Sequence, residues 1–270
     1  MPDEAEPGPD RLRHRRILDL LAVRRDATVD ELTDFLEVSP ATVRRDMAEL
    51  ARLGLVKRLR GGLVLMTPLA REPSFSQREI TRSAEKAAVG RAAAEFVRDN
   101  DVVFLDGGTT MELLVPALAE RSGLTVLTCG INVAARMTRY PSLRGIMLGG
   151  EIHADSQTII GTLAEVLLNV YGLRCDVAFI AAAGVSARGG ATNRMIDRIP
   201  LKRRAMGMAE KSVLVADGSK LGVEAFARIA DIGDFAAVVT DASAPTSELE
   251  ALRALGVEVV VALSGTEPAR

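Results

Sequence analysis

The segment Asp106-Gly-Gly-Thr-Thr110 has the residue types of a phosphate-binding loop. It follows an apolar run and precedes a helical pattern. Glycines let the backbone close on a ligand, and the N-terminus of a helix presents unpaired N–H groups to an anion. An ordinary turn from a strand to a helix would have the same composition, so other residues must decide between these interpretations. The candidate ligand-binding residues in this segment are Asp106, Gly107, Gly108, Thr109 and Thr110.

Other apolar runs also end in turns that contain glycine or hydroxyl groups. These turns are Thr128–Asn132, Gly149-Gly150, Ala183-Gly184 and Asp217–Lys220. If the runs are parallel strands, their carboxyl ends meet at one sheet edge, where such folds bind ligands. We therefore expect one small-molecule site that also includes Asn132, Gly150 and Lys220, with Lys220 as the partner of a phosphate or carboxylate. The spacing of the glycines and the lysine differs from that of a nucleotide P-loop.

A cluster of cations lies between residues 39 and 65. Six basic residues occur there with only two acidic ones, although the net charge of the whole chain is −2. A local basic cluster on a nearly neutral chain indicates an anionic partner, and nucleic acid first. The basic residues are Arg44, Arg45, Arg52, Lys57, Arg58 and Arg60.

Three short helices and a hairpin are expected to position these cations. Apolar spacing predicts a helix over 11–24, which residues 26–28 interrupt. Thr28 and Glu31 have the spacing of a capping box and begin a second helix. Ser39-Pro40 suits the start of a third helix, which runs to Leu53 before Gly54 ends it. Two short strands follow around Gly61-Gly62.

This arrangement predicts a winged helix-turn-helix. The recognition helix of such a domain places short side chains near base edges and cations near phosphates. Val43, Met47 and Leu50 would face the two preceding helices. The alternative is a small helical domain with a solvated, charged face. The expected partner is a double-stranded DNA operator, and the expected DNA contacts are Ser39, Thr42, Arg44, Arg45, Lys57, Arg58 and Arg60.

After residue 85, apolar runs alternate with helical stretches. The predicted strands cover 102–105, 124–127, 144–148, 177–181, 213–216, 236–240 and 257–262, and the predicted helices 85–98, 110–121, 131–139, 162–170 and 247–254. This alternation indicates a mostly parallel sheet covered on both faces. The fold class is α/β, with a small N-terminal winged helix-turn-helix domain before a larger α/β domain. The expected division is a disordered tail (1–10), the DNA-binding domain (11–65), a linker (66–84) and a ligand-binding and oligomerisation domain (85–270).

Composition excludes several classes of protein. Hydrophobic residues make up 48% of the chain, enough for a packed core. No apolar run approaches the roughly 20 residues of a membrane span, and the acidic start does not resemble a signal peptide. The cysteines, Cys129 and Cys175, and the histidines, His14 and His153, are far apart in the sequence. We expect no metal site, no disulfide, no cofactor and no membrane contact, and a cytoplasmic location.

The sequence resembles the DeoR family of bacterial transcriptional regulators. The resemblance begins with SPATVRRDMAELARLGLVKRLRGG and continues through Glu72–Arg78 and Glu85-Lys86. It extends through Asp106–Thr110, Gly149-Gly150 and Asp217–Lys220, so it covers about residues 11–245. Three segments depart from the family pattern. Arg60 stands where histidine is common, Cys129-Gly130 where an asparagine and a small polar residue are usual, and Met195–Pro200 is unusual.

The resemblance implies a function as well as a fold. Sensor domains of this family are similar to sugar-phosphate isomerases and are thought to bind phosphorylated sugars or related metabolites. Asp106, Gly108, Thr109, Thr110 and Lys220 match the ligand-loop positions of the family. We therefore expect a repressor of a carbohydrate operon, controlled by a phosphorylated sugar. Symmetric operators require two DNA-binding domains, so a homodimer or homotetramer is expected.

Two other functions stay open. The second domain could retain isomerase activity, which needs a general base at the substrate C–H. Asp106 and Asp217 are the candidates, but orienting the glycine loop and pairing with Lys220 explain them as well. Cys129 lacks a histidine partner and is expected to be an apolar filler. We thus predict no catalytic residue and no enzyme. In the third interpretation, the second domain only dimerises.

Overall fold

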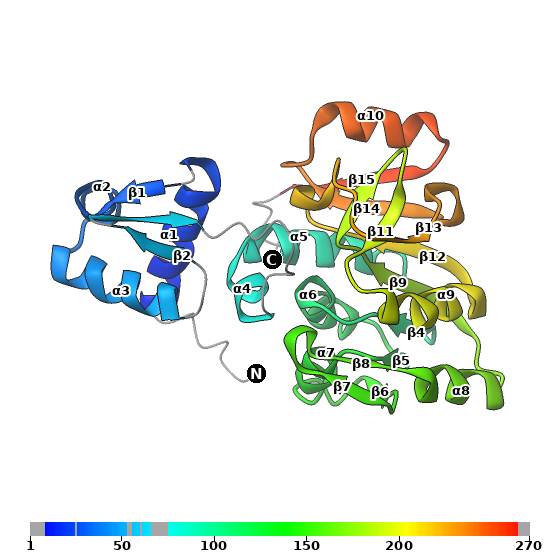
Figure 1. The fold of residues 1–270 in the computed structure, drawn as a ribbon. Helices are drawn as coiled ribbons and strands as arrows, with labels where there is room; N and C mark the ends of the chain where they lie inside the picture. Colours follow the sequence, from blue (N-terminus) through cyan, green and yellow to red (C-terminus); the bar gives the residue numbers. More distant parts are fainter. Residues whose placement is uncertain (1–8, 25, 53–55, 60, 66–74, 264–270) are drawn as a thin grey trace. The chain divides into compact units, whose positions relative to one another are not determined.

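The computed structural model describes residues 9–24, 26–52, 56–59, 61–65 and 75–263. The chain divides into two compact units, Met1–Ser83 and Ala84–Arg270 (Figure 1). Each unit has its own hydrophobic core. Within the described ranges, no helix is long and apolar enough to cross a membrane.

The first unit contains helices and a small antiparallel sheet. The helices are α1 (Pro9–Arg24), α2 (Val29–Leu36), α3 (Pro40–Arg52) and α4 (Phe75–Ile80). The strands are β1 (Asp26–Thr28), β2 (Val56–Leu59) and β3 (Gly62–Leu65), in the order β1-β3-β2. The predicted helices and hairpin are therefore present. Fully buried side chains from all three predicted helices form the core, among them Ile17, Leu21, Leu32, Val43 and Leu50.

Local sequence explains how α2 begins and why a third strand forms. The Thr28 backbone N–H donates to Glu31 Oε2 (2.7 Å), and the Glu31 N–H donates to Thr28 Oγ1 (3.2 Å), so the predicted capping box is confirmed. Residues 26–28, predicted only to interrupt the helix, form β1 and pair with β3. Gly62 allows this pairing, because a Cβ atom there would lie 2.5 Å from the Ala27 carbonyl oxygen.

Part of the segment predicted as a linker is helical. Residues 66–74 lie outside the described residues, but α4 occupies 75–80 and α5 (Ser83–Ala94) begins before residue 85. Phe75 is buried, and Ile80 packs against the core of the first unit. The prolines at positions 68 and 73 suggested an irregular segment, but these two apolar side chains stabilise a helix just beyond them.

The second unit is built on a seven-stranded parallel sheet. Its strand order is β15-β14-β12-β9-β4-β5-β6, and every neighbouring pair is parallel. The strands are β4 (Val102–Leu105), β5 (Thr125–Thr128), β6 (Arg144–Met147), β9 (Cys175–Ala181), β12 (Ala209–Val215), β14 (Ala237–Asp241) and β15 (Glu258–Ala262). All seven predicted strands are present, and the prediction of a mostly parallel sheet is confirmed.

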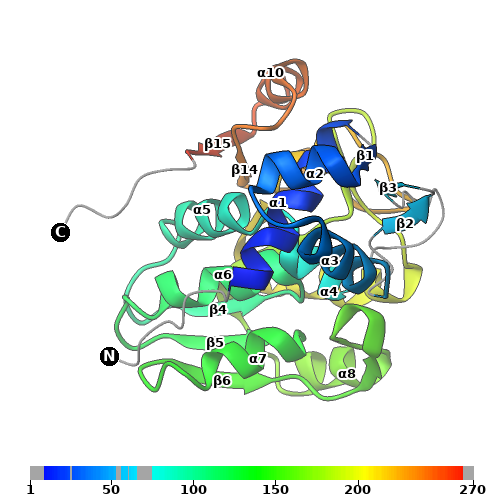
Figure 2. The same ribbon diagram turned by 90° about the vertical axis from the view of Figure 1, so that its left-hand side faces the viewer.

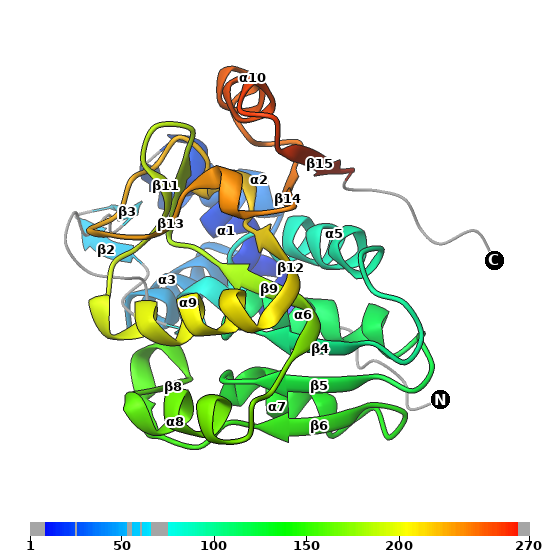
Figure 3. The same cartoon turned by 90° about the vertical axis from the view of Figure 1, so that its right-hand side faces the viewer.

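Helices cover both faces of this sheet (Figures 2 and 3). On one face, α5, α6 (Thr109–Leu118) and α7 (Ile131–Met137) pack over a core that includes Met111, Leu114 and Val126. On the other, α8 (Thr162–Val170), α9 (Ile199–Met208) and α10 (Thr246–Ala254) pack over a core that includes Phe104, Ile180 and Leu214. Both faces of the central strands are therefore buried, as the continuous apolar runs predict.

Several short elements were not predicted. They are the hairpin β7 (Glu151–His153) and β8 (Thr158–Ile160), helix α9, and the small antiparallel sheet of β10 (Gly184–Ser186), β11 (Gly190–Asn193) and β13 (Ala227–Ala230). Each of these strands has only three or four residues and no long apolar run. They lie in the connections of the parallel sheet, where they complete the surroundings of its carboxyl edge.

Candidate DNA-binding helix and ligand site

The start of α3 is fixed by Ser39. Its Oγ accepts a hydrogen bond from the Thr42 N–H (3.2 Å) and lies 2.9 Å from Thr42 Oγ1. Ser39 is exposed and Thr42 half-buried. These two residues therefore set the start of α3 and still reach its outer surface.

The inner face of α3 is tied to α1 by a buried carboxylate. Asp46, which is 3% exposed, accepts a hydrogen bond from Arg13 Nε (2.8 Å), and its Oδ1 lies 3.2 Å from His14 Nε2. Asp46 is one of the two acidic residues within the basic cluster at 39–65. Its spacing of three residues from the buried Val43 would have placed it on the inner face.

The outer face of α3 presents two cations. Arg44 and Arg45 are both exposed. Among the described residues, neither guanidinium has an internal hydrogen bond or ion pair. Arg52, near the end of the same helix, differs because it pairs with Glu49 at 2.6 Å. Arg44 and Arg45 are thus the α3 cations that are available to an external anion.

The predicted wing is an antiparallel hairpin. Arg58 is exposed on β2, where it is opposite Leu63 of β3. Lys57 precedes it in β2, opposite Val64. The predicted DNA contact Arg60 lies outside the described residues. The hairpin therefore places Lys57 and Arg58 one after the other on its outer strand, since β3 pairs with β1 on its other side.

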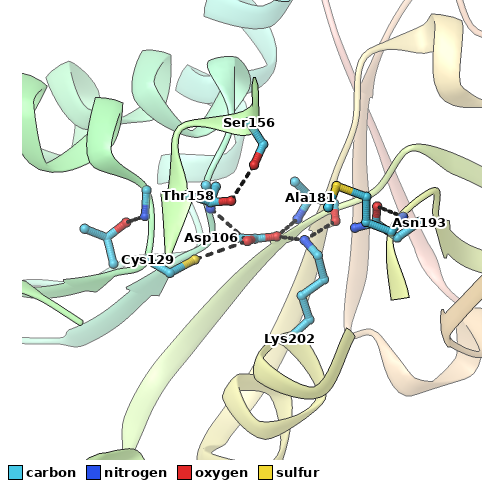
Figure 4. Close-up of polar contacts among 11 residues, drawn as sticks. Asp106, Cys129, Ser156, Thr158, Ala181, Asn193 and Lys202 are labelled. Carbon is cyan, nitrogen blue, oxygen red and sulfur yellow. Dashed lines mark hydrogen bonds and ion pairs between the residues drawn. The ribbon is translucent and has the colours of Figure 1, made fainter. Parts of the chain in front are cut away.

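The second site lies at the carboxyl end of β4. Asp106, 2% exposed, accepts hydrogen bonds from the Gly107 N–H (2.8 Å) and Cys129 Sγ (3.5 Å) on Oδ1. Its Oδ2 accepts from the Ala181 N–H (3.0 Å) and from Lys202 Nζ. Both carboxylate oxygens are therefore occupied by internal donors, and Asp106 joins β4 to the neighbouring strand ends (Figure 4).

Lys202 and Arg198 are cations of this site that the sequence analysis missed. Lys202, on α9, is 2% exposed and donates to Asp106 and to the Ala181 carbonyl oxygen (2.9 Å). Arg198, just before α9, is 7% exposed. Burial would raise the pKa of Asp106, but Lys202 and then Arg198 outweigh it and hold that pKa below its usual value. Burial lowers the pKa of Lys202, although Asp106 opposes this.

The glycine loop contains one glycine that is tightly packed and one that faces open space. Gly107 is required by packing, because a Cβ atom there would overlap Thr158 Cγ2 of β8. Gly108 has φ +135°, and a Cβ atom there would meet no heavy atom within 4 Å. Helix α6 begins next, at Thr109, without a side-chain cap on its N-terminal N–H groups. The side chains of Thr109 and Thr110 form no internal hydrogen bond with other described residues.

Asn132 joins this loop from the start of α7. Its Nδ2 donates to the Gly108 carbonyl oxygen (3.1 Å) and to Glu112 Oε2 (3.0 Å). Its Oδ1 is buried and has no hydrogen-bond partner among the described residues. The structure therefore brings Asn132 together with Asp106, Gly107, Gly108 and Thr109, as the sequence predicted, and leaves one acceptor unused.

The surroundings of Gly150 and Lys220 differ from those of the glycine loop after Asp106. At Gly150 a Cβ atom would lie 2.5 Å from Ile159 Cγ2 and 2.8 Å from the Ile160 carbonyl oxygen, so packing against β8 explains this glycine. Lys220 is half-buried in a 3-10 turn (Gly218–Lys220) after β12, which Asp217 caps through the Ser219 N–H (3.1 Å). In the sheet, β9 separates β12 from β4, and thus Asp217 from Asp106.

The site has few groups suited to proton transfer. Burial, and then the Asp106 carboxylate, raises the pKa of Cys129 to about 12, so its thiol stays protonated near neutral pH. Among the described residues, no group of three or more His, Cys, Asp or Glu side chains could hold a metal ion. The groups that the arrangement does offer are two buried cations, an uncapped helix N-terminus and an open glycine, which are features suited to an anion.

Comparison with protein families identifies both units. Residues 13–68 match the model of the DeoR-like helix-turn-helix domain, and residues 81–242 match the DeoR C terminal sensor domain. The chain belongs to the DeoR family of transcriptional regulators. The resemblance stated from the sequence is confirmed.

Relatives in the DeoR family match this chain along nearly their whole length. The uncharacterized HTH-type transcriptional regulator YulB of Bacillus subtilis is 30% identical over 92% of this chain and 95% of its own. The glycerol-3-phosphate regulon repressor of Escherichia coli is 30% identical over 89% and 94%. A solved ribose 5-phosphate isomerase from Methanocaldococcus jannaschii has 16% identity, covers 50% of this chain and 52% of its own, and has a TM-score of 0.37, too low for residues to be equated.

Proposed function

We propose that this DeoR-family protein is a transcriptional repressor that binds an operator of a carbohydrate operon through α3 and the β2–β3 hairpin. The observation that carries the proposal is the outer face of α3, where Arg44 and Arg45 are exposed without internal partners among the described residues, on a helix held by a buried core. Cations on a recognition helix bind phosphates and base edges in the major groove. The repressor of the glycerol-3-phosphate regulon in E. coli supports this assignment.

We also propose that the sensor unit binds a small phosphorylated metabolite. The site would use the uncapped N-terminus of α6, the open backbone at Gly108, and the hydroxyls of Thr109 and Thr110 for the phosphate. The unused Oδ1 of Asn132 would accept a hydrogen bond from a hydroxyl of the ligand. Gly107 and Gly150 would act by packing, and Lys220 would approach from the turn after β12, which β9 separates from β4.

The partners and the location follow from these two sites. One recognition helix reads one half-site, so a symmetric operator requires a homodimer or homotetramer. A protein that binds chromosomal DNA works beside it, in the cytoplasm. Isomerase activity is not favoured, because Asp106, the carboxylate nearest the glycine loop, already accepts hydrogen bonds on both oxygens. A proton acceptor needs a free lone pair directed at the substrate.

An operator-binding measurement tests the DNA-binding assignment. The operator is first selected from a library of random duplexes with the full-length protein, and affinity is then measured by fluorescence anisotropy over a range of salt concentrations. Replacing Arg45 with alanine should weaken binding and make the salt slope smaller by about one released counterion. The matched control is Arg253→Ala, an exposed arginine on α10. Equal affinity and slope for Arg45→Ala and the wild type would reject this role of α3.

A further inference from the structure

The ligand site of the sensor unit contains three charged side chains that are almost fully buried. Asp106 and Lys202 are each 2% exposed, and Arg198 is 7% exposed. Burying a charge is costly, and a well-packed apolar group of the same size is often at least as stable. Asp217 and Asp241 are also buried at the carboxyl edge of this parallel sheet, after β12 and in β14, but Lys202 and Arg198 act on the Asp106 carboxylate. Two buried cations at one carboxylate, at the edge where such folds bind ligands, indicate a functional cluster.

Lys202 connects three elements of this edge. Its ammonium group, on α9, contacts the Asp106 carboxylate after β4 and the Ala181 carbonyl oxygen at the end of β9 (2.9 Å), as Figure 4 shows. Asp106 Oδ1 in turn accepts a hydrogen bond from the Gly107 N–H (2.8 Å). The ion pair between Lys202 and Asp106 therefore couples α9 to the glycine loop. A change at Lys202 would therefore reach both α9 and the loop that begins α6.

The charges of the cluster are complementary to a phosphate monoester. One carboxylate accompanies two cations, and the N-terminus of α6 next to it has no side-chain cap. A dianion entering beside Gly108, where the backbone is open, would meet positive groups on two sides. A neutral sugar or an amine would not have this complementarity.

We infer that Lys202, assisted by Arg198, binds the phosphate group of the effector, and that the phosphate replaces the Asp106 carboxylate as the partner of Lys202. This inference rests on the proposed sensing of a phosphorylated metabolite and names the residues that read the phosphate. Binding thereby exchanges one ion pair for another and releases α9 from the glycine loop. The requirement for a phosphate on the effector thus lies in Arg198 and Lys202, at the start of α9, and not in the Lys220 turn alone.

The test uses the full-length protein with two probes, inorganic phosphate and glycerol 3-phosphate. Thermal stabilisation is measured against probe concentration, with glycerol and with chloride at equal ionic strength as controls. The variants are Lys202→Gln, Asp106→Asn and, for comparison, Lys220→Gln at the other lysine proposed for the site. Lys202→Gln should weaken binding of both phosphates by about tenfold or more, because a charge-assisted hydrogen bond is lost. Lys220→Gln should weaken it less.

The Asp106→Asn variant gives the distinguishing result. If the carboxylate competes with phosphate for Lys202, removing its charge should strengthen phosphate binding several-fold. A residue that only maintains the structure would weaken binding when it is changed. Weaker binding by folded Asp106→Asn, or unchanged binding by Lys202→Gln, would overturn the inference. If Asp106→Asn does not fold, phosphate binding by Lys202→Gln and Lys220→Gln still tests whether Lys202 binds the phosphate.

Operator affinity of the same samples separates this inference from the proposed function. If wild type binds operator but neither phosphate probe stabilises it, the exchange at Lys202 is rejected and the DNA-binding assignment stands. If phosphate binds as expected but no operator is selected, the repressor assignment fails and the phosphate site stands.

Discussion

Asp46 is a single carboxylate that holds the basic helix α3 in position from its buried side. It is buried on the inner face of α3 and bonds to Arg13 and lies within reach of His14 on α1. Because Arg44 and Arg45 directly precede it, this bond to α1 fixes the direction in which they point. The negative charge within the basic cluster is therefore structural.

Replacing Asp46 with alanine should destabilise the first unit by about 3 kcal/mol, because Arg13 and His14 lose a buried anionic partner. Hydrogen exchange of the α3 amides in the full chain measures this loss, since it reports the stability of that unit separately. The control is Glu49→Ala, which removes the exposed pair with Arg52 and should cost less than about 1 kcal/mol. Unchanged exchange of α3 in Asp46→Ala would contradict the structural role.

The sensor site could be predicted from the sequence only in part. Asp106, Gly108 and Asn132 follow strands with clear apolar runs, so the sequence indicates their meeting at the sheet edge. Lys202 was missed because Lys202-Arg-Arg204 has the composition of a solvated helix face. It is buried only because α9 packs across the sheet. The spacing of Leu201, Ala205 and Met208, all buried, was the signal that could have indicated this helix.

At the scale of elements, the sequence predicts the strands of the parallel sheet and misses the short antiparallel ones. The central strands of the parallel sheet, such as β9 and β14, are buried on both faces and have clear apolar runs. The β7–β8 hairpin and the β10-β11-β13 sheet have three or four residues per strand and depend on partners distant in sequence. These strands pair because of tertiary packing, and the residues within each strand do not by themselves indicate the pairing.

The β7–β8 hairpin is expected to hold the glycine loop in place. Because a Cβ atom at Gly107 would overlap Thr158 Cγ2, Gly107→Ala should lower the free energy of unfolding by about 1–3 kcal/mol. Thr158→Ser removes that methyl group and keeps the hydroxyl that lies 2.6 Å from Ser156 Oγ. The double variant should therefore recover part of the loss.

Urea denaturation of the four proteins, followed by circular dichroism, gives the coupling between the two positions. The control is Gly233→Ala, where an added Cβ would meet no heavy atom within 4 Å. Additive effects of Gly107→Ala and Thr158→Ser would show that β8 does not set the need for glycine in this loop.

At the scale of the molecule, the charge distribution matches the division into two units. The chain has a net charge of −2, yet Arg44 and Arg45 on α3, which are exposed and have no partner among the described residues, belong to the first unit. The buried cations at Asp106 belong to the second unit and are shielded from DNA by burial. Each unit therefore has its own group of cations, one at the surface of α3 and one buried beside Asp106. Regulation requires that the two be coupled, with a typical coupling free energy of about 1–3 kcal/mol.

The assembled protein should read two half-sites on one face of the DNA. The chain supplies one recognition helix, α3, and symmetric operators are bound by two such helices separated by one turn of DNA, about 10 base pairs, or a multiple of it. Inserting about 5 base pairs between the half-sites of the selected operator should therefore weaken binding strongly, because the second half-site turns to the opposite face. Inserting about 10 should restore part of the affinity. Fluorescence anisotropy with the three duplexes measures this, and sedimentation velocity gives the number of chains bound. Equal affinity for all three spacings would mean that each chain binds its half-site independently.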